Sequence, residues 1–302
     1  MRDNEGNRKA GGSAAGTSLG KRRRLARLLY EHGPANGTLM ILPLDHGIEH
    51  GPVDFLPNPV AADPAFQVRL AAEGGYSAIA IGPGLAERYL EDGAVRVPLI
   101  LKLNGKTNIP DDAEAVSPLM ASVEDAVRLG ADAVGYTFYV GSPRQDEEFR
   151  QYRLVKADCE RLGMPLMMWA YPRGRAIEEK GGKGSLYAID YAARLALELG
   201  ADIVKLHEPG PPNERCPAPY RGMDEPREER IRRVVRSAGR TLPLFSGGQK
   251  VDDEGQILEA VRRVMDSGAA GIVFGRNMWQ RPFEQAVALS HKAREVLARY
   301  GR

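Results

Sequence analysis

The feature that most limits how this chain can fold is an apolar segment that returns eight times along it. These segments are Thr38–His46, Ser77–Gly82, Pro98–Asn104, Ala133–Tyr139, Leu166–Pro172, Ile203–Pro209, Pro243–Gly248 and Gly271–Arg276. Most are continuously apolar, which is typical of strands covered on both faces. The stretches between them have amphipathic, helix-like spacing. These are Asp63–Gly74, Ser122–Gly130, Glu147–Gly163, Leu186–Gly200, Pro226–Ala238, Glu254–Gly268 and Phe283–Tyr300.

Strict alternation of strand and helix predicts a parallel sheet, and eight such units close the sheet into a barrel. An open doubly wound sheet is the main alternative, and it would show a glycine-rich dinucleotide-binding turn after its first strand. The segment Leu44–Gly51 reads LDHGIEHG and lacks that pattern. We therefore predict an α/β protein with a single (β/α)8 TIM barrel over residues 21–302. Residues 1–20, rich in Gly, Ser, Ala and Asn, are expected to form a disordered arm.

Composition narrows the setting in which the protein works. The chain has two cysteines, Cys159 and Cys216, too few for a disulfide framework, which favours a cytoplasmic location. No apolar run approaches the roughly 20 residues of a membrane helix, and residues 1–20 do not resemble a signal peptide. The basic N-terminal arm has no aromatic residues on which bases could stack. We expect neither a membrane nor a nucleic-acid partner.

Polar residues mark the carboxyl ends of several predicted strands, where barrel enzymes carry their catalytic groups. They are Asp45 and His46 on the first strand, Lys102 on the third, Trp169, Tyr171 and Arg173 on the fifth, and Lys205 and His207 on the sixth. We expect Lys102 to be among the residues that bind the substrate. Alternate residues of a strand share a face. Trp169 and Tyr171 can therefore both point into the barrel, as can Lys205 and His207.

Lys205 lies in the apolar stretch Ala201–Leu206, where a buried charge is unfavourable unless it is paired or neutralised. Burial lowers the pKa of a lysine and so frees its amine to attack a carbonyl group. The alternative is a structural lysine in an ion pair with a carboxylate of a neighbouring strand. With Tyr171 on the adjacent strand and Asp45 across the barrel, we favour the nucleophile.

A second pattern predicts phosphate binding. Ser246, Gly247 and Gly248 end the seventh strand, and Gly275 and Arg276 end the eighth. The loops after these two strands commonly bind phosphate through backbone N–H groups and a short helix. Tight strand-to-helix turns also use glycine, but the coincidence at both strands favours a phosphate site.

The segment His46–His50 has the H-x-x-E-H spacing of a zinc site. That motif requires a helix, whereas this segment directly follows a strand and contains Gly47. We therefore predict a loop and no metal site, with His46 as a candidate contact of a substrate phosphate. His207 is interpreted as a structural residue.

Taken together, seven segments resemble the archaeal-type class I fructose-bisphosphate aldolases, within the wider group that includes deoxyribose-phosphate aldolase. They are Asp45–Pro52, Leu101–Thr107, Gly135–Thr137, Trp169–Gly174, Gly200–Lys205, Ser246–Gly248 and Gly275–Arg281. The resemblance implies that Lys205 forms the Schiff base, that Tyr171 is the acid/base and that Asp45 is the first-strand aspartate. It also implies that Trp169 shapes the pocket. The phosphate-binding elements would be Ser246, Gly247, Gly248, Gly275 and Arg276, with Arg173 a candidate for a second phosphate.

The resemblance further implies reversible cleavage of fructose 1,6-bisphosphate, without a metal or other cofactor, in a homo-oligomeric ring that serves glycolysis and gluconeogenesis. The related aminodideoxyheptulosonate synthases share the lysine, tyrosine and aspartate but resemble the chain less at Trp169 and Ser246. A non-catalytic sugar-phosphate-binding barrel is a third possibility, although it would not need all three catalytic groups. The proline-rich segment Glu208–Pro226 is longer than the loop usual in the family, and it can act as a lid or alter which aldehyde fits.

Overall fold

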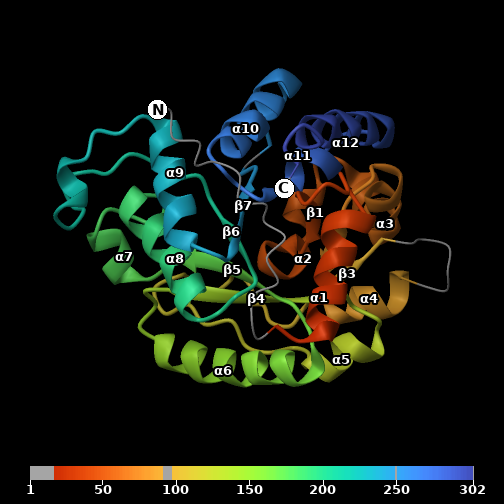
Figure 1. Ribbon diagram of the computed structural model, residues 1–302, viewed down its shortest axis with the longest axis horizontal. Coiled ribbons are helices and arrows are strands. Elements are labelled where there is room, and N and C mark those ends of the chain that lie inside the picture. Colours follow the sequence, from red (N-terminus) through yellow and green to blue (C-terminus); the bar gives the residue numbers. More distant parts are fainter. Residues whose placement is uncertain (1–16, 91–96, 249, 302) are drawn as a thin grey trace, which may run out of the picture.

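The computed structural model describes residues 17–90, 97–248 and 250–301. Within these residues eight parallel strands close into one barrel in chain order, with β8 hydrogen-bonded to β1 (Figure 1). The strands are β1 (Leu39–Leu44), β2 (Ala78–Ile81), β3 (Leu99–Lys102), β4 (Ala133–Val140), β5 (Leu166–Pro172), β6 (Ile203–Leu206), β7 (Leu242–Ser246) and β8 (Gly271–Val273). Each overlaps one of the predicted segments, and only β4 and β7 extend beyond theirs, by one residue each. The predicted (β/α)8 barrel is confirmed.

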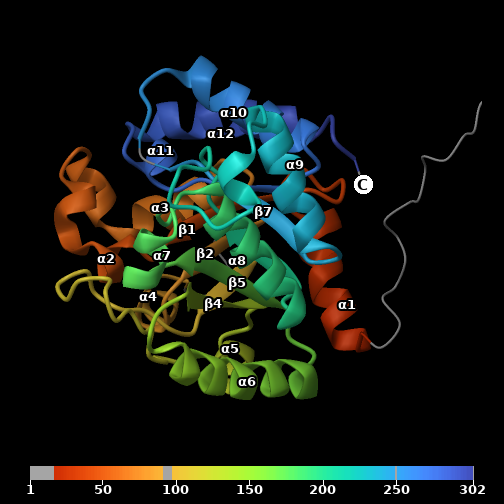
Figure 2. The same cartoon turned by 90° about the vertical axis from the view of Figure 1, so that its left-hand side faces the viewer.

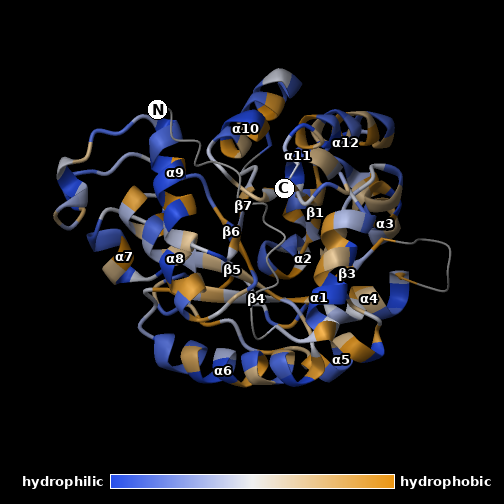
Figure 3. Cartoon of the chain, in the orientation of Figure 1, coloured by the Kyte–Doolittle hydropathy of each residue, from blue (hydrophilic) through white to orange (hydrophobic). Residues whose placement is uncertain are grey.

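Helices surround the barrel, and those such as α6 and α10 carry both hydrophilic and hydrophobic residues (Figure 3). The α-helices are α1 (Leu19–Ala26), α2 (His46–Glu49), α3 (Pro64–Glu73), α4 (Pro83–Tyr89), α5 (Val123–Arg128), α6 (Gln145–Leu162), α7 (Arg175–Glu179), α8 (Leu186–Glu198), α9 (Arg227–Ala238), α10 (Glu254–Asp266), α11 (Arg276–Trp279) and α12 (Phe283–Leu297). Shorter turns are the π-helix η1 (Arg27–Glu31) and the 3-10 helices η2 (Gly51–Phe55), η3 (Pro59–Ala62) and η4 (Tyr220–Gly222). In the described part of the chain, no helix combines the length and apolar character that crossing a membrane requires.

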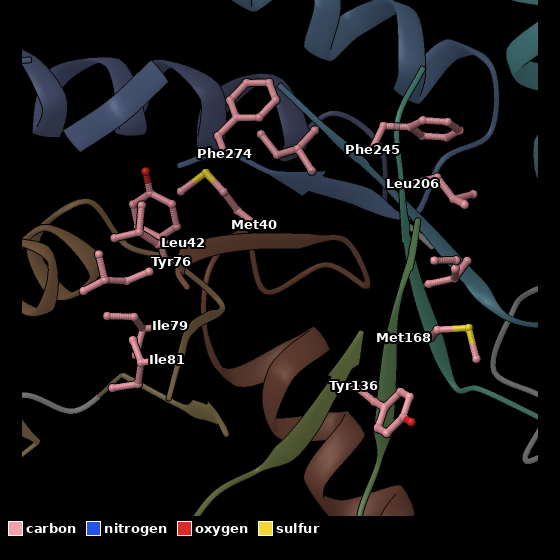
Figure 4. Packing of buried hydrophobic residues seen from close by; sticks show 14 of the residues in the cluster. Met40, Leu42, Tyr76, Ile79, Ile81, Tyr136, Met168, Leu206, Phe245 and Phe274 are labelled. Carbon is pink, nitrogen blue, oxygen red and sulfur yellow. The ribbon is translucent and has the colours of Figure 1, made fainter. Parts of the chain in front are cut away.

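Strand residues divide between two cores according to their parity. One set faces into the barrel and includes Ile41, Ile100, Met167 and Leu244. The other set packs between the strands and the helices, as Figure 4 shows for residues such as Met40, Leu42 and Met168. Since both faces of every strand are buried, the strands can be apolar without alternation, as the sequence pattern indicated.

The N-terminal helix covers the amino-terminal ends of the strands. The side chain of Ser18 caps α1, and the fully buried Leu28 of η1 joins the core inside the barrel. Lys21 pairs with Glu160 at 2.7 Å and with Asp202, just before β6, at 3.2 Å. Figure 2 shows α1 on the opposite side of the barrel from α2. The carboxyl ends of the strands are thereby left for the functional site.

The predicted arm of residues 1–20 lies outside the described residues up to residue 16. Its last two residues, Leu19 and Gly20, belong to helix α1. The helix therefore begins two residues earlier than expected. The physical reason is the serine at position 18, whose side chain accepts a hydrogen bond from the backbone N–H of Lys21 and so starts the helix.

Candidate active site

A cavity of about 150 Å³ opens at the carboxyl ends of the strands. Its lining residues come from the ends of β1, β5, β6, β7 and β8. They are Pro43, Asp45, His46, Glu49, His50, Tyr171, Arg173, Lys205, His207, Ser246, Gly247, Gly248, Val273, Gly275 and Arg276. All the residues expected at the site line it except Lys102 and Trp169, which lie beneath it in the barrel.

A second and larger cavity, of about 350 Å³, lies between β7 and α10. Its described lining residues include no lysine, tyrosine or histidine that could act as a nucleophile or a proton carrier. Size alone therefore does not identify the reactive site. We place it in the smaller cavity, where titratable groups from the ends of four strands, β1, β5, β6 and β8, converge.

Lys205 and Tyr171 form the centre of this cavity. Lys205 lies opposite Trp169 in the register of β5 and β6, and Tyr171 lies two residues further along β5 on the same face. The Nζ atom of Lys205 donates a hydrogen bond of 2.6 Å to the hydroxyl of Tyr171. Burial lowers the pKa of Lys205, although Asp45 and Glu49 oppose the shift. Burial also raises the pKa of Tyr171 well above its ordinary value, with the charges of Glu49 and Asp45 adding to the effect.

Asp45 forms an ion pair with Lys102, which lies deeper in the barrel. Its Oδ2 atom lies 3.5 Å from the Nζ atom of Lys102, which also donates to Thr137 Oγ1 at 2.5 Å. Burial alone would raise the pKa of Asp45, but the charges of Lys102 and Lys205 prevail and lower it to about 2. Lys102 is thus the counter-ion of a carboxylate that stays ionised.

The space for Lys102 depends on a glycine of the next strand. The ammonium group of Lys102 lies 4.3 Å from the ring centroid of Trp169. A Cβ atom on Gly135 would stand 2.8 Å from both Lys102 Cδ and Trp169 Cζ3. Only glycine leaves room for both side chains inside the barrel.

The corner formed by β7 and β8 has the properties expected of an anion site. Gly247 cannot carry a side chain, since a Cβ atom there would stand 2.7 Å from Phe274. Arg276 begins α11 directly after Gly275, and its guanidinium Nη1 lies 3.8 Å from Asp54 Oδ1. Its buried Nε atom makes no hydrogen bond to any residue that the structure describes. This N–H group of Arg276, which has no acceptor in the described part of the chain and lies beside the cavity, can donate a hydrogen bond to a bound oxyanion.

The segment after Asp45 differs from the expectation. His46–Glu49 forms the helical turn α2, not a loop, because Gly47 and its neighbours take helical angles directly after the strand. The ring of His46 packs edge-on against Trp279 at 5.2 Å between centroids, and its Nδ1 atom lies 3.6 Å from Asp45. Burial lowers the pKa of His46 to about 4, although Asp45 opposes it. The imidazole is therefore neutral near pH 7.

Arg173 lies at the mouth of the cavity, where β5 ends. Its Nε atom pairs at 2.9 Å with Asp112, which comes from the loop after β3. The other oxygen of Asp112 lies 3.3 Å from Lys106 Nζ. The carboxylate of Asp112 thus forms ion pairs with both Arg173 and Lys106. The sequence pattern gave no indication of Asp112, since it lies in no predicted strand or motif.

His207 and Glu49 also line the cavity, although the sequence analysis gave neither of them a role in catalysis or substrate binding. Burial raises the pKa of Glu49, and the negative charge of Asp45 adds to the shift. His207 contacts both Tyr171 and Ser246. Its position two residues after Lys205 was the signal that could have revealed it.

The proline-rich segment 208–226 packs away from the cavity. Asn213 donates to Gly181 O at 2.9 Å, and Gly210 N donates to Gly184 O at 2.8 Å. Tyr220 donates to Asp190 of α8 at 2.8 Å. The structure describes all of residues 209–226, and none of them lines the cavity. In this structure the segment is therefore anchored to α8 and the loop before it.

The fold and the site together define a class of protein: a (β/α)8 barrel enzyme with a buried lysine and a neighbouring tyrosine arranged for carbonyl chemistry. A family model described as DeoC/LacD family aldolase matches residues 39–281. The class 1 fructose-bisphosphate aldolase of Thermoproteus tenax is 43% identical over 246 residues, which are 81% of this chain and 84% of that protein. The 2-amino-3,7-dideoxy-D-threo-hept-6-ulosonate synthase of Halobacterium salinarum is 32% identical over 87% of each chain.

A solved structure of an archaeal fructose-1,6-bisphosphate aldolase has its catalytic lysine covalently bound to the carbinolamine intermediate of the substrate. It superposes with a TM-score of 0.77 at 38% identity, covering 91% of this chain and 99% of the other. The chain belongs to the DeoC/LacD family of aldolases.

Proposed function

We propose that this protein is a class I aldolase that reversibly cleaves fructose 1,6-bisphosphate to dihydroxyacetone phosphate and glyceraldehyde 3-phosphate. The observation that carries the proposal is the buried Lys205, hydrogen-bonded to Tyr171 at 2.6 Å beside the β7–β8 corner. The family and the 43% identity to a class 1 fructose-bisphosphate aldolase support the same substrate.

Lys205 would act as the nucleophile. Its lowered pKa increases the share of free amine, which attacks the C2 ketone and expels water to give an iminium ion. When the C3–C4 bond breaks, its electron pair moves into the iminium and leaves an enamine on C3. Because the iminium is the electron sink, this chemistry needs no metal ion.

Tyr171 and Asp45 would carry the protons. Tyr171 is the group that would protonate the enamine carbon, and its raised pKa keeps it in the protonated form. Asp45, ionised with a pKa of about 2, would accept the proton of the C4 hydroxyl. It would also transfer protons to and from the carbinolamine. Each such group typically contributes about 10²–10⁴-fold in rate.

The phosphates of the substrate would be held at two sides of the cavity. Ser246, Gly247, Gly248, Gly275 and Arg276 would bind the phosphate nearer C2 and so hold the ketone against Lys205. Arg173 would bind the other phosphate, and Lys106 is close enough to assist through the shared Asp112. Lys102 would act through Asp45, with which it pairs, and Trp169 would hold Lys102 in place from 4.3 Å.

Borohydride trapping tests the proposal. Protein is reduced in the presence of dihydroxyacetone phosphate and the modified lysine is identified by peptide mass mapping. We expect an adduct on Lys205 and none in a Lys205→Met variant, whereas Lys156→Met on the surface of α6 serves as the control and should be labelled normally. An adduct on another lysine, or cleavage abolished by EDTA and restored by zinc, would refute the mechanism.

A substrate panel separates the alternatives. The 32% identity to the Halobacterium synthase makes that carbon–carbon chemistry the second candidate, and turnover of its substrates without cleavage of fructose 1,6-bisphosphate would select it. Binding of sugar phosphates with no turnover at all would indicate a sensor or scaffold.

The cellular setting follows from the same proposal. We place the enzyme in the cytoplasm, in glycolysis and gluconeogenesis, where Cys159 and Cys216 would stay as the buried free thiols that they are. We propose a homo-oligomeric ring. The exposed apolar residues Val53 on η2, Val60 on η3 and Leu56 between them are candidates for its interface. Light scattering of the purified chain would test the oligomer, and a monomer would exclude it.

A further inference from the structure

His207 contacts a candidate functional residue on each strand next to β6: Tyr171 on β5 and Ser246 on β7. It follows Lys205 by two residues, so it emerges on the same side of the chain and lines the cavity. Its ring stacks on that of Tyr171, with centroids 5.3 Å apart and planes inclined by 16°. Its Nδ1 atom lies 2.8 Å from the hydroxyl oxygen of Ser246. One side chain therefore contacts both the tyrosine of β5 and the serine of β7.

The charge state of His207 limits what these contacts can be. Burial lowers its pKa to about 3, and the nearby charges of Lys205 and Arg173 act in the same direction. A neutral imidazole has one N–H donor and one acceptor. The hydroxyl of Ser246 has a single proton to donate. If that proton goes to a phosphate oxygen, the proton between Ser246 and His207 must come from Nδ1–H of the histidine.

The hydrogen bond thus aligns Ser246 as a donor toward the cavity. The stack has a separate consequence, because it fixes the tilt of the Tyr171 ring and hence the position of its hydroxyl, 2.6 Å from Lys205. Parallel offset rings are a favourable arrangement that restricts rotation of both partners.

We infer that His207 is a positioning residue that orients Ser246 to donate to the substrate phosphate and holds the ring of Tyr171 against Lys205. It contacts the acid/base and the phosphate-binding residue without being either. The inference rests on the proposed aldolase function for its kinetic consequences, whereas its phosphate half can be measured without turnover.

Two substitutions separate the two contacts. His207→Phe keeps an aromatic ring against Tyr171 but cannot hydrogen-bond to Ser246. His207→Asn keeps an N–H donor near the place of Nδ1 but has no ring to stack. The surface variant His291→Phe on α12 is the matched control for exchanging a histidine.

The two variants are compared by steady-state kinetics, which show whether each substitution changes KM, kcat or both. For His207→Phe we expect KM for fructose 1,6-bisphosphate to rise roughly 5–10-fold, the loss of about one hydrogen bond, with kcat within about two-fold. For His207→Asn we expect the reverse: KM within about two-fold and kcat about ten-fold lower. A residue that is merely structural would lower both parameters together in both variants, or neither. Either of those results would overturn the inference.

Binding of inorganic phosphate, measured by titration calorimetry, adds a test without catalysis. The Phe variant should bind phosphate roughly 5–10-fold more weakly than the wild type, and the Asn variant should bind it equally. Equal affinity in the Phe variant and the wild type would refute the role toward Ser246. If the wild type binds phosphate but forms no borohydride adduct on Lys205, the proposed aldolase function fails while the phosphate result still stands.

Thermal denaturation shows whether the variants are folded. If His207→Phe does not fold, Ser246→Ala reports on the same hydrogen bond from its other end. An unchanged affinity for phosphate in folded Ser246→Ala protein would then refute the inference.

Discussion

Replacing Lys102 with methionine would test whether the ion pair beneath the cavity stabilises the protein through Asp45. Methionine has nearly the volume of lysine, so the change removes the charge and leaves the packing against Trp169 largely intact. In the variant, the buried carboxylate of Asp45 loses the ammonium group that lies 3.5 Å from it. Lys205 and His46 remain beside it.

The magnitude follows from the pKa of Asp45. A shift of the Asp45 pKa from 3.8 to about 2 corresponds to roughly 2–3 kcal/mol of stability, since one pKa unit is worth about 1.4 kcal/mol. Because the folded-state pKa is the lower one, this contribution is present above about pH 4 and is lost as the pH falls through about 2. Removing one partner of a buried pair typically costs about 3–5 kcal/mol. We therefore expect Lys102→Met to lose about 3 kcal/mol at pH 7.

Urea denaturation at a series of pH values measures this loss. The difference between the wild type and Lys102→Met should be largest near pH 7 and should narrow as the pH falls from about 4 to about 2, where the wild type loses the contribution of ionised Asp45. The double variant Asp45→Asn/Lys102→Met removes both charges. It should be less destabilised than the sum of the single variants by more than about 1 kcal/mol. Lys292→Met on α12 is the exposed control and should change stability by less than about 0.5 kcal/mol.

The reasoning is refuted if Lys102→Met is as stable as the wild type at pH 7. It is equally refuted if the loss does not depend on pH, or if the two single variants add without coupling. In each of these cases Asp45 would owe its ionised state to groups other than Lys102, such as Lys205 and His46.

Three further predictions concern other parts of the barrel. Gly135→Ala places a methyl group 2.8 Å from Lys102 Cδ, so we expect a loss of about 1–3 kcal/mol, and an unchanged melting temperature would contradict the packing argument. Burial raises the pKa of Glu148 from 4.5 to about 7. The folded-state value is the higher one, so ionisation destabilises the fold and stability should fall by up to roughly 3 kcal/mol between about pH 4.5 and 7. Glu148→Gln should abolish that slope in denaturation experiments, and a slope retained in the variant would assign it to another group. Arg276→Met should raise KM for the phosphorylated substrate roughly 10–100-fold, and a change below about two-fold in steady-state kinetics would exclude Arg276 from the phosphate site.

The order and number of the strands could be derived from the sequence because they depend on local patterns. A strand covered on both faces must be apolar throughout, and glycines such as Gly74 and Gly163 end several of the helices, so the repeats are visible without any tertiary contact. The strand ends also placed Lys205, Tyr171 and the glycines of the β7–β8 corner together, since all carboxyl ends of a parallel barrel meet on one side. The start of α1 was missed by two residues because a single serine cap decides it.

The division of roles within the site could not be derived in this way. Lys102 looked like a substrate-binding residue at a strand end, yet closure of the barrel turns it toward Asp45 and Trp169, beneath the cavity. Asp112 joins Arg173 across a separation of 61 positions, and no local pattern reports such a pair. Which side chains meet inside the barrel depends on register between strands and on the space that residues such as Gly135 leave open.

The amino-acid sequence by itself therefore determined the barrel and the identity of its candidate nucleophile, because alternation, burial and strand ends are local properties. Only the tertiary structure decided how the groups around that nucleophile pair with one another. It made Lys102 a counter-ion, turned His46–Glu49 into a helical turn and stacked His207 on Tyr171. Charge pairing and stacking depend on distances of a few ångströms between residues far apart in the chain, and those distances exist only once the barrel has closed.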